Sequence, residues 1–152
     1  MKKWIIFTLF CGLLLWKPFT ATDVARLKPV EVIRVSTFAG GVLVETDTGD
    51  SGVGKSISGA IGDLKRTTDG DVFLDTVDRL LVSPAAVSML YELGEYLRPG
   101  CNVCVEMGKV ELDSVGAYLN MHEPCVTLQD HRAGQMALPV LYVVDGRMYL
   151  EQ

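Results

Sequence analysis

Residues 42–64 read VLVETDTGDSGVGKSISGAIGDL, and the order of elements in this stretch decides the fold. The first five residues, 42–46, are rich in β-branched side chains and predict a strand. From Ile57 to Leu64 the apolar residues recur at helical spacing and predict a helix. Between them, residues 49–56 match the phosphate-binding pattern G-x-x-x-x-G-K-[ST] letter for letter. Strand, glycine-rich loop and helix are the order that a phosphate site requires.

The glycine-rich stretch supports one functional hypothesis, a small phosphate- or nucleotide-binding protein. Its site would consist of Gly49, Gly54, Lys55 and Ser56. The loop N–H groups would cradle the phosphates, the lysine would reach the terminal oxygens, and the serine hydroxyl would bind magnesium. A working site also needs a carboxylate at the end of a second hydrophobic strand to hold magnesium. Asp75 is the only candidate, and it follows the lysine too closely for the usual intervening elements, which argues against this hypothesis.

The N-terminus has the pattern of an export segment, which also argues against a nucleotide ligand. Lys2 and Lys3 precede an apolar run, residues 4–16, that is short for a membrane span but suits a secretory signal. We therefore expect residues 1–21 to be a signal peptide or an uncleaved signal anchor, followed by a tether over residues 22–29. The lysines would stay inside, so the remainder would be extracytoplasmic, either membrane-anchored or secreted.

Residues 30–152 predict a single α/β (α+β) domain with a mixed β-sheet. Gly40-Gly41 and Asp145-Gly146 mark an N-terminal and a C-terminal β-hairpin. Between them, strands and about three helices alternate, which favours a largely parallel core with the helices packed on it. Strands are expected over 30–36, 42–48, 72–74, 79–82, 102–107, 138–144 and 147–151, and helices over 57–64, 83–97 and 111–120.

The charge distribution narrows the choice of partner. The formal net charge is -5, and no block of Lys or Arg occurs along the chain. A nucleic-acid partner needs a clustered basic face that neutralises phosphates, so we expect none. Membrane contact is expected only through the N-terminal segment.

Four potential zinc ligands support another hypothesis, a structural zinc-binding domain. Cys101 and Cys104 form a C-x-x-C pair, and His122 and Cys125 form an H-x-x-C pair. A disulfide between two of the three cysteines is an alternative in an exported chain, and buried structural thiols are another. Redox catalysis is disfavoured because Cys101 precedes a predicted strand and not a helix N-terminus. The interpretation that we favour is that the cysteines are structural, either buried or paired. No cofactor other than the possible zinc ion is expected.

Residues 31–119 resemble the N-terminal domain of the Ger(x)C spore-germination proteins, the C subunits of nutrient germinant receptors. The resemblance rests on the hairpin, on KSISGAIGDL at residues 55–64, and on the strand around Phe73 and Leu80-Leu81-Val82 with the helix and strand that follow. In that family the corresponding turn opens a helix and binds no nucleotide, which implies that Ser56 is a helix cap. The family members are lipoproteins of several domains, whereas this chain has one domain and lacks the small residues of a lipobox before Cys11.

The function that we expect from these patterns is a non-catalytic, exported and membrane-tethered protein-interaction module. The resemblance connects that module with spore germination in a spore-forming bacterium and implies that it works through protein contacts. No complete set of catalytic residues is recognisable in the sequence, so an enzyme is not expected.

Overall fold

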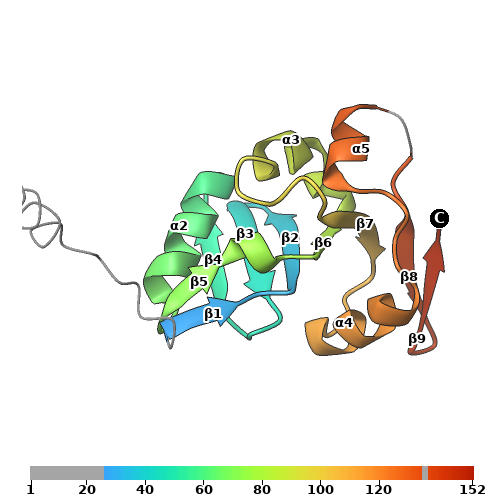
Figure 1. The fold of residues 1–152 in the computed structure, drawn as a ribbon, viewed down its shortest axis with the longest axis horizontal. Helices are drawn as coiled ribbons and strands as arrows, with labels where there is room; N and C mark the ends of the chain where they lie inside the picture. The colour runs from blue at the N-terminus through green and yellow to red at the C-terminus, as the bar shows by residue number, and fades with distance from the viewer. Residues whose placement is uncertain (1–25, 135–136) are drawn as a thin grey trace, which may run out of the picture.

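The computed structural model describes residues 26–134 and 137–152, so the predicted signal segment over residues 1–21 lies outside the described residues. A seven-stranded sheet has the order β4-β3-β2-β6-β7-β8-β9 (Figure 1). Its strands are β2 (Val32–Phe38), β3 (Gly41–Thr46), β4 (Ser51–Gly54), β6 (Arg79–Val82), β7 (Asn102–Met107), β8 (Val140–Val144) and β9 (Arg147–Glu151). In the part of the chain that is described, no helix has the length and apolar character needed to cross a membrane.

The sheet is mixed, as the sequence predicts. The neighbours β2, β6, β7 and β8 are parallel to one another, whereas β3, β4 and β9 run antiparallel to their neighbours. Both hairpins are confirmed. Asp145 and Gly146 have φ angles of 51° and 73°, the positive values that a two-residue hairpin turn requires, and they join β8 to β9.

Four helices pack on the sheet among the described residues: α2 (Ile57–Thr67), α3 (Leu90–Leu93), α4 (Leu112–Met121) and α5 (Leu128–Arg132). The helix expected after Ser83-Pro84 begins there as a 3₁₀ helix, Pro84–Met89, and only its last turn, α3, is α-helical. The proline occupies the first helical turn, as expected, because its missing N–H has no partner to lose there.

Each face of the sheet has its own hydrophobic cluster because successive strand residues point to opposite faces. One cluster joins Ile33, Val35, Leu80 and Val103 to side chains of α2, α3 and α5, with Leu64 and Leu128 among them. The other joins Val32, Leu81, Cys104 and Leu141 to Val115 and Leu119 of α4. The domain therefore has three layers, with α4 alone on the second face (Figure 1).

Three described elements differ from the expectations. Strand β1 (Leu27–Pro29) lies inside the predicted tether and pairs in parallel with β5 (Asp71–Phe73). Strand β4 lies inside the predicted glycine loop. Helix α5 lies where a loop was expected, although a capping box formed by Thr127 and Asp130 marks its start. All three elements have five residues or fewer, which is too short for a periodic signal.

Candidate functional site

The glycine-rich stretch is built as a turn, a strand and a helix cap. Gly49 lies in the turn after β3 with a φ angle of 82°. Residues 51–54 are extended and pair with β3, so strand β4 separates Gly49 from Lys55 and Ser56. Ser56 caps α2, and its Oγ accepts a hydrogen bond from the Gly59 N–H at 3.2 Å. The cap is the role that the Ger(x)C resemblance implies for this serine.

The glycines of the motif allow β4 to approach α2 very closely. A Cβ atom on Gly52 would lie 2.3 Å from the carbonyl oxygen of Ala60, and one on Gly54 would lie 2.3 Å from the Ala60 nitrogen. Any side chain at either position would collide with helix backbone. Close strand-to-helix packing therefore accounts for Gly54, and the positive φ angle of the turn accounts for Gly49, without a phosphate. The four predicted phosphate ligands do not form one loop.

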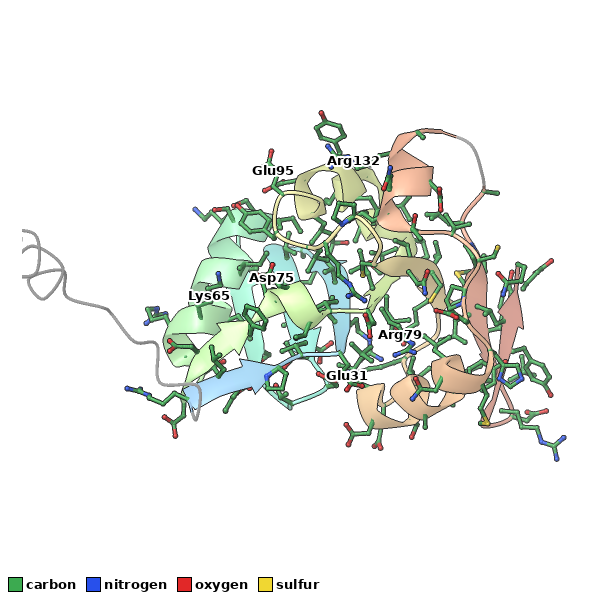
Figure 2. All side chains as sticks on the ribbon, viewed as in Figure 1. Glu31, Lys65, Asp75, Arg79, Glu95 and Arg132 are labelled. Carbon is green, nitrogen blue, oxygen red and sulfur yellow. The ribbon has the colours of Figure 1, made fainter. Side chains whose placement is uncertain are left out.

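The candidate magnesium carboxylate, Asp75, lies outside the glycine-rich stretch. Asp75 lies in the 3₁₀ helix Leu74–Thr76, where it is exposed (Figure 2). Lys55 is exposed as well.

The four predicted zinc ligands do not converge. Cys101 belongs to the cluster beneath α2 and α3, whereas Cys104 belongs to the cluster beneath α4, so the two thiols lie on opposite faces of the sheet. His122 stacks on Tyr118 with ring centroids 4.4 Å apart, and Cys125 is exposed. Within residues 26–134 and 137–152, no group of three or more His, Cys, Asp or Glu side chains is placed to hold a metal ion.

The three described cysteines are free thiols, so none of the predicted disulfide pairs is formed among them. Burial raises the pKa of Cys101 to about 12, and burial together with the charge of Glu106 raises the pKa of Cys104 to about 12. Both thiols therefore stay protonated at neutral pH. Cys101 and Cys104 are therefore buried structural thiols, which is one of the alternatives expected from the sequence.

The candidate functional surface is the part of the second sheet face that α4 leaves uncovered. The hydrophobic cluster beneath α4 takes residues from β2, β6, β7, β8 and β9, but none from β3 or β4. Side chains of β2, β3 and β4 that point to this side form cross-strand rows, with Ser36 beside Leu43 and Leu43 beside Val53. We call the surface formed by Ser36, Leu43, Glu45 and Val53 the open face. Val53 is 50% exposed there.

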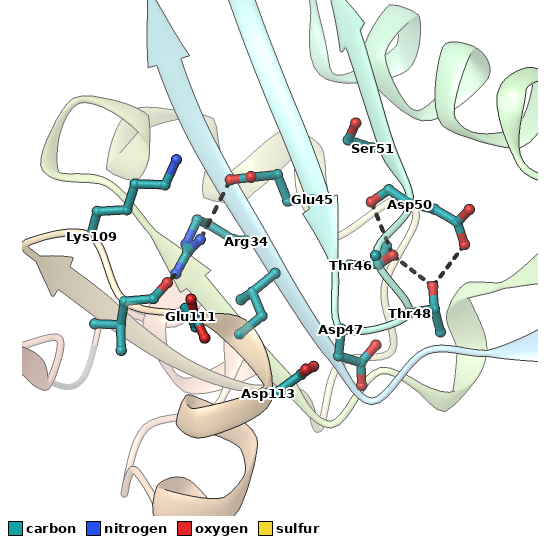
Figure 3. Close-up of a pocket in the computed structure, with 13 residues that line it drawn as sticks. Arg34, Glu45, Thr46, Asp47, Thr48, Asp50, Ser51, Lys109, Glu111 and Asp113 are labelled. Atoms are coloured by element: carbon teal, nitrogen blue, oxygen red, sulfur yellow. Dashed lines mark hydrogen bonds and ion pairs between the residues drawn. The ribbon is translucent and has the colours of Figure 1, made fainter.

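A buried ion pair forms the border between the open face and α4. Arg34 on β2 is 6% exposed and reaches across β6 to Glu106 on β7. Its Nε donates to Glu106 Oε2 at 2.7 Å, and its Nη2 donates to Glu106 Oε1 at 2.9 Å. Nη2 also donates to the carbonyl oxygen of Val110, and Nη1 lies 3.5 Å from Glu45 Oε2 (Figure 3). The charge of Arg34 is thus neutralised by the buried carboxylate of Glu106 and by the partly exposed carboxylate of Glu45.

Two adjoining hollows flank this ion pair and share Arg34, Glu45 and Lys109 in their walls. The larger has a volume of about 660 Å³ and lies between the β3–β4 turn and the start of α4 (Figure 3). The smaller has a volume of about 340 Å³ and extends over Ser36 and Leu43 of the open face. The two hollows lie on either side of this ion pair along the border of the open face, and we refer to them together as the groove.

The rim of the larger hollow is acidic, but part of its acidity is used within the fold. Asp47 Oδ2 accepts the backbone N–H groups of Glu31 and Val32, each at 3.1 Å. Asp50 accepts a hydrogen bond from Thr48 at 2.8 Å. The carboxylates of Glu111 and Asp113 face the hollow from the other wall (Figure 3). The larger hollow is therefore lined by more acidic than basic residues, with Lys109 among the basic ones, and the smaller hollow beside it contains the apolar side chain of Leu43.

These residues were not singled out in the sequence. Arg34 and Glu106 are separated by 72 positions, and each is the only charged residue of a strand that is mainly apolar. A charged residue inside each of two buried strands was the only available signal, because such residues are rarely buried unless they are paired.

Comparisons with protein-family models, with curated proteins and with solved structures find no match to this chain. The class that the fold itself defines is a single mixed α/β domain.

Proposed function

We propose that this chain is a non-catalytic protein-interaction module, exported and tethered to a membrane by its N-terminal segment, and that a partner protein docks on the open face. The proposed partner contact covers Leu43 and Val53 and reaches the acidic rim near Glu45. A partner segment with apolar residues flanked by Lys or Arg would complement such a surface.

The observation that carries this proposal is the incomplete second layer of the sheet. A sheet face buries its apolar side chains against another layer in most domains. Here the cluster beneath α4 takes residues from β2 and from β6 to β9, while Leu43 and Val53 remain outside it. A docked segment would complete the layer.

The chemistry around Arg34 supports docking over catalysis. Its guanidinium group donates three hydrogen bonds to Glu106 and Val110 and is paired with Glu45. A group held in this way positions the β7–α4 loop beside the open face, and it has little freedom to react with a substrate. The ion pair would then act as a rigid wall of the docking groove.

The tether and the connection with germination rest on the sequence. The apolar segment over residues 4–16 supports attachment at the membrane. The Ger(x)C resemblance supports a role in spore germination, and the cap formed by Ser56 agrees with that resemblance. We propose both as properties of the full chain.

The proposal can be tested by partner retention in the native membrane. The full chain would be purified with a mild detergent as wild type, as Val53→Lys, and as the matched control Tyr91→Lys, which alters an exposed residue on α3. We expect one stoichiometric protein that is retained by the wild type and the control but is lost from Val53→Lys. Equal retention by all three forms would overturn the open face as the docking site.

A further inference from the structure

The two edges of the seven-stranded sheet differ in how they are protected. At the β4 edge, side chains of α2 hold two of the outward backbone groups. The Val53 N–H donates to Asp63 Oδ2 at 3.0 Å, and Thr67 Oγ1 donates to the carbonyl oxygen of Ser51 at 3.3 Å. Such contacts prevent another strand from pairing there. The opposite edge is β9, and within the described ranges no strand pairs on its outer side (Figure 1).

The outward backbone groups of β9 follow from its hairpin. The Asp145-Gly146 turn makes Val144 and Arg147 the first hydrogen-bonded pair, and such pairs alternate along the strand. Met148 and Leu150 therefore direct their N–H and C=O groups away from β8. In agreement with this, the Leu150 N–H donates to Tyr118 Oη at 3.1 Å. For the other three outward groups, the described residues supply no hydrogen-bond partner.

Strand β9 is complementary to itself in charge. Its sequence is Arg147-Met148-Tyr149-Leu150-Glu151. When two such strands lie antiparallel about Tyr149, Arg147 of one copy faces Glu151 of the other, and the same pair recurs at the opposite end. In this register Met148 faces Leu150, so outward N–H and C=O groups meet each other. We propose that two copies of this chain associate through their β9 edges in this register and join their sheets into one.

A row of exposed side chains supports the same register. Met107, Tyr142 and Tyr149 are neighbours across β7, β8 and β9. Met107 is 45% exposed and Tyr149 is 50% exposed. In the pair of chains, Tyr149 lies directly beside Tyr149 of the second copy, and the row continues across the twofold axis. Cross-strand aromatic pairs of this kind stabilise antiparallel strands.

Among residues 26–134 and 137–152, the Tyr118 hydroxyl is the group that competes with a second copy for this edge. It accepts the Leu150 N–H in the single chain, and this N–H changes its acceptor to the carbonyl oxygen of Met148 when the second copy binds. On the same side of the strand, Met148 and Leu150 already pack against the cluster beneath α4, which becomes continuous between the two copies.

Charge reversal tests the proposed register. Sedimentation analysis of the full chain in detergent would compare wild type, Arg147→Glu, Glu151→Arg and the double variant Arg147→Glu/Glu151→Arg. Each single change places like charges opposite each other at both ends, and we expect dimerisation to weaken by about tenfold or more. The double variant restores both pairs and recovers the wild-type affinity. Both residues are exposed, so folding is not expected to change.

Engineered cysteines give a second readout, in a background with Cys11→Ser and Cys125→Ser. Tyr149→Cys lies beside its own symmetry mate, in a non-hydrogen-bonded pair where side chains approach closely, so we expect an intermolecular disulfide. Arg147→Cys does not meet itself, but it forms a disulfide with Glu151→Cys chains when the two variants are mixed.

Several outcomes would overturn the proposal: a wild type that is monomeric at all concentrations, a charge-swapped variant that stays as weak as the single variants, or Arg147→Cys that cross-links with itself as efficiently as Tyr149→Cys. These outcomes leave the proposed docking on the open face unaffected, because the open face lies on the half of the sheet remote from β9.

Discussion

Arg34 and Glu106 form a two-pronged ion pair that joins β2 to β7 across β6, with N–O distances of 2.7 and 2.9 Å. Both residues are buried, at 6% and 7% exposure. The Glu106 carboxylate also accepts the Val110 N–H at 3.0 Å, which fixes the loop before α4. This arrangement sets the boundary between the covered and open halves of the sheet.

Removing one partner of this ion pair should destabilise the domain strongly. In Arg34→Met, Glu106 keeps its charge without the guanidinium, and we expect the free energy of unfolding in urea to fall by about 3–5 kcal/mol. The double variant Arg34→Met/Glu106→Leu should recover most of that loss, because no uncompensated charge stays buried. As a control, Arg66→Met removes an exposed pair with Asp63 and should cost no more than about 1 kcal/mol. A similar loss in all three proteins would contradict the central role of the buried pair.

Alanine substitutions should separate a packing role of the glycines from a phosphate role. Gly52→Ala places a Cβ 2.3 Å from helix backbone, and we expect a destabilisation of about 1–3 kcal/mol or more. Gly62→Ala lies on α2 with nothing within 4 Å of the new Cβ, and it should stabilise the domain by about 0.5–1 kcal/mol. Lys55→Ala should leave stability unchanged, and calorimetry with ATP and magnesium should detect no binding to the wild type. Saturable binding that is lost in Lys55→Ala would reinstate the nucleotide hypothesis.

The carboxylate that protects the β4 edge predicts a specific pH dependence. The hydrogen bond from the Val53 N–H, followed by the contact with Arg66, lowers the pKa of Asp63 from its usual 3.8. A lowered pKa in the folded state stabilises the fold above the unfolded pKa, and this contribution is lost as the pH falls through the folded value. The stability difference between wild type and Asp63→Asn should therefore be largest at neutral pH and should shrink towards pH 2.

An exposed residue of the following loop provides the control for this measurement. Asp69→Asn removes an exposed carboxylate whose side chain makes no hydrogen bond or ion pair with the described residues, so it controls for the loss of a surface charge alone. The pH dependence of wild-type stability also contains a contribution from Asp130, because hydrogen bonds from Thr127 lower the pKa of that carboxylate. The comparison of variants is therefore needed to isolate Asp63. If Asp63→Asn and Asp69→Asn give the same pH profile, Asp63 does not hold the edge in solution.

The thiols should differ sharply in reactivity. In a Cys11→Ser background at pH 8, we expect Cys125 to react rapidly with a disulfide reagent, whereas Cys101 and Cys104 react only on unfolding because burial raises each pKa to about 12. A thiol titration checks this expectation: it should count one reactive thiol per chain in buffer and three in denaturant. If all three thiols reacted slowly with the disulfide reagent, and the purified protein contained stoichiometric zinc, the separation of the thiols across the sheet would be contradicted.

The long elements could be predicted from the sequence because each carries its own local signal. The Asp145-Gly146 turn and the β-branched run over β3 specify hairpins by themselves, and the spacing of Ile57, Ala60, Ile61 and Leu64 specifies α2. Strand β7 was predicted with the bounds that the structure has, Asn102–Met107. These features depend on residues that are close in sequence.

The functional surface could not be predicted in the same way. The open face exists because the cluster beneath α4 includes β2 and β6 to β9 but leaves this face of β3 and β4 uncovered. No local sequence pattern specifies where a helix will pack. The G-x-x-x-x-G-K-[ST] match was misleading for a physical reason. Gly49 is needed for the positive φ angle of a turn and Gly54 for the close approach of a strand to a helix, and together these two demands place glycines at both glycine positions of the pattern.

Site-specific photocross-linking in the native cell tests docking on the open face most directly. A photoreactive residue would replace Val53, which is 50% exposed on that face, and in a parallel strain would replace Ser58, which is exposed on α2 at the other face of the sheet. We expect one cross-linked protein from position 53 and none from position 58. Cross-linking from position 58 alone, or equal cross-linking from both positions, would contradict a partner that docks on the open face.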